Sequence, residues 1–203
     1  MASLLDSLEQ ICKDVVAPNA DAVDRSASFP KASMDALRTA GFYGLTSARE
    51  MGGVGDGIRA AAQVVERLAR ECGSTAMVTC MHYVGTAVIE KFGTESTRRE
   101  IAAGNHLSTL AFSEAGSRSH FWAPTSSAAQ NGHGIRLDAK KSWVTSANHA
   151  TAYVWSSRPI AAEGASTIWL VPRNAKGLRI GSGFDGIGLR GNDSTPVVAE
   201  NVV

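Results

Sequence analysis

The sequence predicts an α+β fold, with a helical first half to about residue 106 and a β-rich second half. Apolar residues recur at helical spacing in the first half, whereas short β-branched and aromatic runs take over in the second. Glycine, asparagine, aspartate and proline separate those runs. A chain of 203 residues has the length of one or two domains. We therefore expect domains at residues 1–106 and 107–203.

Composition narrows the functional class. Lys and Arg total 20 against 19 Asp and Glu, so the net charge of +1 argues against a nucleic-acid-binding surface. The N-terminus has no positively charged region typical of a signal peptide, and the most apolar stretch, residues 76–89, is too short to span a membrane. No pair of the three cysteines forms a CxxC motif, so we expect reduced thiols in a cytoplasmic protein and no metal site.

The first predicted helices carry apolar stripes between proline and glycine signals. Residues 4–16 have one apolar face, and Pro18 is expected to end that helix. Pro30 stands where a first helical turn tolerates it, and the helix that follows closes near Gly41. The glycine run 52–57 lacks both phosphate-loop spacings, so we interpret it as a turn.

Three more helices complete the predicted first domain. Residues 58–71 form one of them. Ser74 is expected to cap the next, which is apolar on nearly all sides and ends at Gly93, so other helices should surround it. Thr94 is expected to cap a last short helix that ends at Gly104.

The second half contains short strand patterns spaced like those of a barrel or a sandwich. The Asn131-Gly132 pair between two of these runs is a hairpin signal. The predicted strands are residues 107–112, 125–130, 135–137, 143–145, 153–157, 167–171 and 197–203.

Common catalytic motifs are missing from the sequence, which has no HExxH, no GxSxG and no histidine pair at metal-ligand spacing. The five histidines are spread out, and such histidines are more often surface or satisfied core residues than ligands. They are His82, His106, His120, His133 and His149.

Two segments of the second half carry the residue types of a ligand site. In LAFSEAGSRSH (110–120) a strand ends in hydroxyls and small residues, whose side chains and backbone N–H groups can meet an anion or a heteroaromatic edge. In KKSWVTSA (140–147), period two places Trp143 and Thr145 on one strand face, which suits an aromatic ligand. A plain surface turn and a core tryptophan are the structural alternatives.

Both segments, about 30 residues apart and in this order, resemble the acyl-CoA dehydrogenase family. AREMGGVG (48–55) is similar to a family turn, and KFGTE (91–95) is similar to a family helix end. GLRGNDST (188–195) with residues 197–203 resembles a family strand. The resemblance runs in the same order over essentially the whole chain.

The resemblance implies that a helical N-terminal domain and a β-barrel-like middle domain hold FAD. Family members oxidise acyl-CoA thioesters to the α,β-enoyl form. A carboxylate removes the α-proton while a hydride passes to flavin N5, and the electrons leave to an electron-transfer flavoprotein. The resemblance therefore implies an oxidoreductase of fatty acid metabolism.

Site residues follow from the same resemblance. Phe112 and Ser113 match the pair at the flavin pyrimidine edge, and Leu110 is assigned to the same cofactor site. Trp143 matches the tryptophan against the isoalloxazine, and Thr145 matches the hydroxyl that faces N5.

Ser119 matches a serine near the pyrophosphate and the CoA arm of the substrate, so it is assigned to both cofactor and substrate. The neighbouring residues depart from the family pattern: Ala115 replaces proline, Arg118 a small residue and His120 aspartate. Together with Trp122 they either reshape the ligand channel or serve packing.

The sequence stops where the β domain of the family ends, so we expect a third, helical domain to be absent. That domain carries the catalytic glutamate in the family, and no residue here matches it. We expect the chain alone to bind FAD weakly and not to turn over. We also expect a homo- or hetero-oligomer, because the absent domain leaves apolar surface uncovered.

Three readings remain at this point. The chain is either a truncated or split dehydrogenase, or a non-catalytic scaffold or partner subunit of a hetero-oligomeric dehydrogenase. A third reading is a flavin-dependent monooxygenase of the same superfamily.

Overall fold

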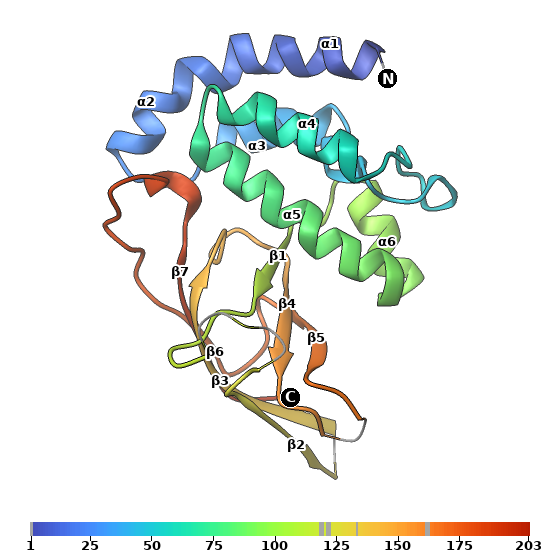
Figure 1. Cartoon of the computed structure of the whole chain (residues 1–203), viewed down its shortest axis with the longest axis vertical. Helices are drawn as coiled ribbons and strands as arrows, with labels where there is room; N and C mark the ends of the chain where they lie inside the picture. The colour runs from blue at the N-terminus through green and yellow to red at the C-terminus, as the bar shows by residue number, and fades with distance from the viewer. Residues whose placement is uncertain (1, 118–119, 121–122, 133, 161–162) are drawn as a thin grey trace. The chain divides into compact units, whose positions relative to one another are not determined.

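The computed structural model describes residues 2–117, 120, 123–132, 134–160 and 163–203. It divides into two units. The helical unit comprises Met1–Leu107 and Asp185–Asp193, and the β unit comprises Ser108–Phe184 and Ser194–Val203. Figure 1 shows the helices and the strands of these units. Residues 185–193, which the sequence analysis assigns to the second domain, pack in the helical unit.

The first helical segment runs through the expected stop at Pro18, so that prediction is wrong. Helix α1 (Ala2–Ile11) continues into a π-helical turn (Cys12–Val16) and then α2 (Ala17–Arg25). The N–H of Ala17 donates to the carbonyl of Cys12, five residues back. Pro18 follows this wide turn in the first positions of α2, where a missing N–H costs little.

The remaining helices follow the predicted order. They are α3 (Lys31–Thr39), α4 (Ile58–Ala69), α5 (Gly73–Phe92) and α6 (Glu95–Ala102), with 3₁₀ turns at Phe42–Gly44, Arg49–Met51 and Arg190–Asn192.

The helix caps confirm one prediction and correct another. Thr94 caps α6, since its hydroxyl accepts the Thr97 N–H at 3.2 Å. Ser74 does not cap α5, because Cys72 occupies the cap position and its Sγ accepts the Thr75 N–H. Ser74 lies inside the helix instead, where its hydroxyl accepts the Gly191 N–H at 3.1 Å. A thiol and a hydroxyl two residues apart compete for the cap, and the sequence pattern alone favours the hydroxyl.

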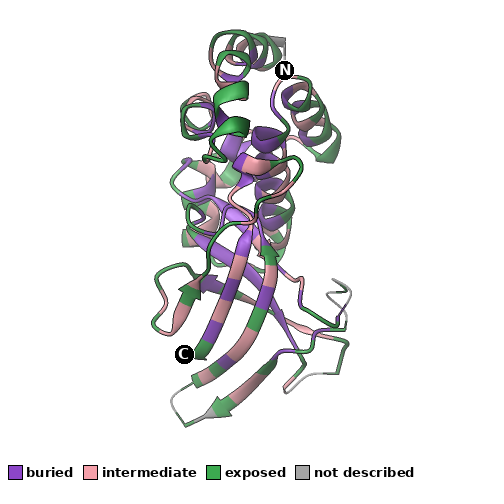
Figure 2. Ribbon diagram, turned by 90° about the vertical axis from the view of Figure 1, so that its left-hand side faces the viewer, coloured by how far each residue is buried: buried purple, intermediate pink, exposed green. Residues whose placement is uncertain are grey.

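Helix α5 is buried on several sides, as its apolar sequence predicts. It contacts α3, α4 and α6 and the 3₁₀ turns 42–44 and 190–192. Two of its buried polar side chains have backbone partners: the His82 Nε2 lies 2.9 Å from the Tyr43 carbonyl, and the Tyr83 hydroxyl donates to the Phe42 carbonyl at 3.0 Å. Figure 2 shows that buried and exposed positions occur on the same helices.

The β unit contains two sheets. In the first, β1 (Ser108–Ala111) pairs parallel with β4 (Ala152–Ser157), and β4 pairs antiparallel with β5 (Thr167–Pro172). The second has the antiparallel order β2-β3-β7-β6, formed by Ser127–Asn131, Gly134–Val144, Thr195–Val202 and Leu178–Ile180. Asn131 pairs with Gly134 across the β2–β3 connection, which confirms the predicted hairpin.

Two strand predictions need correction. The predicted strands 135–137 and 143–145 belong to one strand, β3, which ends at Val144. Charged residues at 138, 140 and 141 interrupt its apolar pattern, although strand pairing with β7 continues past them. Strand β6 was not predicted, because its three residues are too few for a period-two pattern.

No helix of the described residues is long and apolar enough to cross a membrane. All three cysteines are free thiols, with Cys12 and Cys72 buried and Cys80 half-buried. Among the described residues no cluster of three or more His, Cys, Asp or Glu side chains is arranged to hold a metal ion.

Candidate functional site

The two segments singled out in the sequence lie side by side in the β unit. The Ser142 N–H donates to the Ser113 carbonyl at 2.8 Å, and Glu114 forms an antiparallel bridge with Lys141. Residues far apart in the sequence therefore share one backbone junction. The fold thus brings the hydroxyl-rich segment after β1 next to the tryptophan-bearing end of β3.

A second connection joins β1 to the turn after β3. The Thr109 hydroxyl donates to the Thr145 carbonyl at 2.8 Å. Leu110 follows Thr109 in β1, and Phe112 and Ser113 follow the strand; all three are half-buried. These predicted site residues therefore lie on the same part of the β unit as Thr145.

Trp143 and Thr145 do not share a strand face, contrary to the period-two expectation. Strand β3 ends at Val144, its register shifts between Lys141 and Val144, and Thr145 opens the following turn. Trp143 is 59% exposed, whereas Thr145 is buried. A bulge at the end of a strand breaks the regular alternation, and short-range periodicity does not foresee it.

Each of these two side chains has a partner that sequence reasoning missed. The Trp143 ring lies against Phe184, with ring centroids 3.7 Å apart and planes 30° apart. The Thr145 hydroxyl lies 3.2 Å from the Ser194 hydroxyl. Phe184 and Ser194 lie at the two ends of residues 185–193, the segment that packs in the helical unit. Their positions therefore depend on where the chain leaves and re-enters the β unit.

The remaining assigned residue, Ser119, lies outside the described residues, as do Arg118 and Trp122. His120 is exposed, and its N–H donates to the Ser117 carbonyl at 3.1 Å. Ser117 itself is buried, and its hydroxyl donates to the Glu114 carbonyl at 3.1 Å.

A buried ion pair underlies this junction, and the sequence analysis did not find it. The Lys141 Nζ lies 2.6 Å from the Glu114 Oε1, with side chains 0% and 2% exposed. Burial by itself raises the pKa of the Glu114 carboxyl, but hydrogen bonds from Lys141, Ser126 and Thr125 outweigh it and lower the pKa to about 2. The sequence signal that could have revealed it is the adjacent pair Lys140-Lys141. Neighbouring residues of a strand point to opposite faces, so one lysine of such a pair faces inward.

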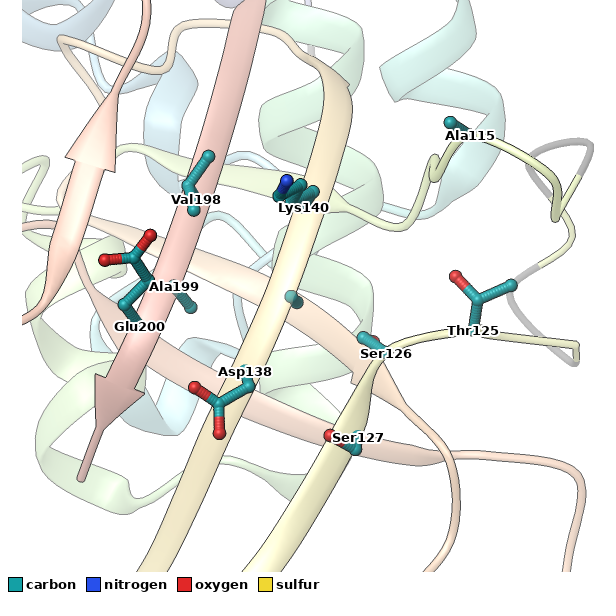
Figure 3. Close-up of a pocket in the computed structure, with 10 residues that line it drawn as sticks. Ala115, Thr125, Ser126, Ser127, Asp138, Lys140, Val198, Ala199 and Glu200 are labelled. Atoms are coloured by element: carbon teal, nitrogen blue, oxygen red, sulfur yellow. The ribbon is translucent and has the colours of Figure 1, made fainter.

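An open hollow of about 470 Å³ lies beside the loop between β1 and β2, which also carries Glu114 (Figure 3). Ala115 and Thr125 come from the loop, whereas Asp138 and Lys140 come from β3 and Glu200 from β7 (Figure 3). Its lining mixes hydroxyls with charges of both signs. This surface has no dominant charge that would select an anion or a cation.

A second hollow, of about 660 Å³, lies in the helical unit between α4 and α5. Its lining is mostly apolar and includes Ala61, Val65, Tyr83 and Val84. This hollow belongs to the helical unit, whereas the two predicted segments belong to the β unit.

The chemistry of the junction suits a flat heteroaromatic ligand. An indole that remains largely exposed offers a stacking surface, and the hydroxyls of Ser113 and Thr145 offer hydrogen bonds to ring heteroatoms. The Thr145 hydroxyl can accept from Ser194 and still donate to a ligand. The donor set therefore fits a flavin ring.

Both halves of the chain match domains of known proteins. Residues 2–104 match the N-terminal domain of acyl-CoA dehydrogenases, and residues 109–202 match the middle domain. The probable acyl-CoA dehydrogenase YngJ of Bacillus subtilis is 27% identical over 205 residues, which cover 97% of this chain and 54% of the relative. Human mitochondrial short-chain specific acyl-CoA dehydrogenase is 28% identical over 208 residues, covering 96% of this chain and 50% of the relative.

Solved structures share the fold. Butyryl-CoA dehydrogenase from Megasphaera elsdenii matches with a TM-score of 0.88 and 21% identity, over 99% of this chain and 55% of that one. Methanesulfinate monooxygenase MsuC from Pseudomonas fluorescens matches with a TM-score of 0.84 and 23% identity, over 98% of this chain and 50% of that one. Similarity at this level establishes the fold.

The chain spans about half the length of the curated relatives that it matches. The two family domains cover nearly all of its residues in the family's order. This chain therefore belongs to the acyl-CoA dehydrogenase family.

Proposed function

We propose that this chain supplies the flavin-holding N-terminal and middle domains of an FAD-dependent acyl-CoA dehydrogenase-type oxidoreductase. The reaction is the α,β-dehydrogenation of an acyl-CoA thioester. The observation that carries the proposal is the junction in the β unit, where the Ser113 and Lys141–Ser142 backbones meet beside the exposed Trp143. Family membership and the fold support it.

The proposed roles follow the chemistry of each side chain. Trp143 stacks on the isoalloxazine, while Leu110, Phe112 and Ser113 line its pyrimidine edge. When the Ser194 hydroxyl donates a hydrogen bond to the Thr145 oxygen, the Thr145 hydroxyl can donate its own hydrogen bond to flavin N5. Bound flavin supplies the two-electron acceptor of the dehydrogenation.

The substrate and partners are part of the same proposal. Ser119 is proposed to contact the pyrophosphate and the CoA arm, and an electron-transfer flavoprotein is the proposed electron acceptor. We assign the α-proton abstraction to no residue of this chain. A carboxylate base and the rest of the acyl pocket then come from a further domain or subunit, in a homo- or hetero-oligomer.

A flavin-dependent monooxygenase is the second candidate, because MsuC matches the fold of this chain about as well as butyryl-CoA dehydrogenase does. The fold therefore does not separate these two chemistries. Oxygen reactivity does: rapid reoxidation of the reduced flavin by O₂ supports the monooxygenase, and slow reoxidation supports the dehydrogenase. A scaffold or partner subunit without catalysis is the outcome if no flavin binds.

The test is an equilibrium titration of the purified 203-residue chain with FAD, followed by visible absorbance and flavin fluorescence. We expect saturable binding with a perturbed flavin spectrum, at an affinity weaker than that of intact dehydrogenases. Trp143→Ala should weaken binding about tenfold, equivalent to about 1.4 kcal/mol, because it removes the stacking surface.

Phe92→Ala is the matched control, since Phe92 is also a strongly exposed aromatic residue but lies in the helical unit, at the end of α5. It should leave the affinity unchanged. Equal affinities of wild type and Trp143→Ala would contradict the assigned site. We also expect no turnover of an acyl-CoA by the chain alone, and steady-state dehydrogenation would overturn the assignment of the base to another domain.

A further inference from the structure

The β unit buries an ion pair between Glu114 and Lys141. Removing two charges from water is costly, and a pair of apolar side chains of similar size often gives equal or greater stability. A buried pair is therefore weak evidence for stability by itself. Its value lies in the geometry that it imposes, because each charge must meet its hydrogen-bond partners in one arrangement.

Lys141 uses its ammonium group to connect two strands and a loop. Its Nζ donates to the Glu114 Oε1 at 2.6 Å, to the Ser156 carbonyl at 2.7 Å and to the Ser156 hydroxyl at 3.2 Å. Ser156 lies in β4, and Lys141 lies in β3. All three donors of the ammonium group are thus used, one on Glu114 and two on Ser156 of β4.

Glu114 fixes the other end of the loop. Its Oε2 accepts the Thr125 hydroxyl at 2.7 Å, the Ser126 N–H at 3.1 Å and the Thr125 N–H. The carboxylate therefore joins the start of the loop, at residue 114, to its end at residues 125 and 126. Four hydrogen bonds to one carboxylate also explain why its charged form persists in a buried position.

The ion pair is next to the predicted flavin residues in the sequence. Ser113 precedes Glu114, and Trp143 lies two residues beyond Lys141. Between them, the Ser142 N–H donates to the Ser113 carbonyl. The register of the Glu114–Lys141 bridge thus determines where Ser113 lies along β3 relative to Trp143.

We propose that Glu114 and Lys141 are positioning residues, which hold the Phe112–Ser113 segment in register with Trp143 before the cofactor binds. This inference rests on the proposed function. A site that is ordered in advance loses less conformational entropy on binding, so the pair contributes to flavin affinity without touching the flavin.

Three variants separate positioning from stability. Glu114→Gln and Lys141→Met each leave one buried charge without its partner, so both should lower the melting temperature and flavin affinity. The double variant Glu114→Gln, Lys141→Met leaves no buried charge. Its glutamine oxygen can still accept from Thr125 and Ser126, but the cross-link to β3 and β4 is gone.

We expect the double variant to recover most of the wild-type melting temperature while its FAD affinity stays at least tenfold weaker, with a less perturbed flavin spectrum. Arg179→Gln is the matched control, because Arg179 and Glu200 form an ion pair on the surface of the same unit. It should leave both the melting temperature and the flavin spectrum unchanged.

Hydrogen exchange gives a second test that needs no variant. In the chain without FAD, the amides of Ser142, Thr125 and Ser126 should already exchange slowly, because their acceptors are in place. Fast exchange that slows only when FAD is added would overturn the proposal, since the cofactor would then organise the junction.

The FAD titrations distinguish failure of the proposed function from failure of the positioning role. If wild type binds no FAD, the proposed function fails. If wild type binds FAD and the double variant binds it within twofold at a similar melting temperature, the proposed function stands and the positioning role is wrong.

Discussion

Two histidines of the helical unit are buried, and both have pKa values well below the ordinary range. Burial lowers the pKa of His82 to about 4, although its hydrogen bond with the Tyr43 carbonyl opposes the shift. Burial likewise lowers the pKa of His106 to about 4, against the nearby charge of Glu100. His82 is thus a satisfied core histidine, whereas the His106 Nε2 has no hydrogen-bond partner among the described residues.

This arrangement predicts a loss of stability in mild acid. The unfolded chain binds protons at these histidines below a pH of about 6.5, whereas the folded chain stays neutral there until about pH 4. The free energy of unfolding should therefore fall between pH 7 and pH 5, by about 2 kcal/mol for each histidine. Urea unfolding at the two pH values measures the loss.

His106→Gln should remove about half of this pH dependence. His149→Gln is the control, because His149 is exposed, and it should keep the full dependence. An unchanged pH dependence in the His106 variant would show that its ring already accepts a proton in the folded state.

Single residues show the limit of local sequence patterns at the candidate site. The residue types were predicted from the sequence, as were the two segments that carry them. The exposure of Trp143 and the burial of Thr145 were not, because a register shift in β3 and the partners Phe184 and Ser194 determine them.

At the scale of elements, the cap of α6 is a local feature that the sequence predicts and the structure confirms. Thr94→Ala should lower the free energy of unfolding by about 1 kcal/mol, because the Thr97 N–H loses its acceptor. Thr94→Ser should retain most of the stability. Denaturant unfolding followed by far-UV circular dichroism measures both changes.

Ser96→Ala is the control for this prediction, since Ser96 is an exposed residue within the same helix. Alanine has a higher helix propensity than serine, so this variant should be as stable as wild type or slightly more stable. Equal stability of Thr94→Ala and wild type would mean that water replaces the cap without cost.

The first helices show where an element-scale signal fails. Proline normally ends a helix because it lacks an N–H and collides with the preceding turn. Here the π-helical turn Cys12–Val16 widens the backbone just before Pro18, so the helical path continues. Buried Leu8, Cys12 and Val16 all join the core cluster of the helical unit, so packing favours this continuous path.

At the scale of the whole molecule, the chain leaves the β unit after Phe184 and contributes residues 185–193 to the helical unit. Gly191 is buried there, and its N–H donates to the Ser74 hydroxyl. A Cβ at Gly191 would lie 2.3 Å from the Val23 Cγ1 and 2.5 Å from the Ser28 carbonyl oxygen. No side chain fits this position without movement of the backbone.

Gly191→Ala should therefore destabilise the helical unit by about 1–3 kcal/mol, as overpacking of a buried site does. The matched control is Gly188→Ala in the same segment, where an added Cβ meets no atom within 4 Å. Thermal unfolding followed at 222 nm measures both variants. An unperturbed Gly191→Ala would show that residues 185–193 do not pack in the helical unit in solution.

Much of the fold was predictable because helices, strands and caps leave patterns among residues that are close in the sequence. The order of helices and strands, the hairpin at Asn131 and the cap at Thr94 each depend on residues close in sequence. Strand β6 and the unity of β3 were missed, since a three-residue strand and a charged strand give no clear period.

The sequence by itself determined the fold class, the family resemblance and the residue types of the candidate site. Only the tertiary structure decided that Ser113 meets Ser142, that Glu114 pairs with Lys141 and that residues 185–193 return to the helical unit. The physical reason is one of range. Periodicity and capping act over a few residues, whereas these contacts join distant segments, and their geometry depends on how all the intervening chain packs.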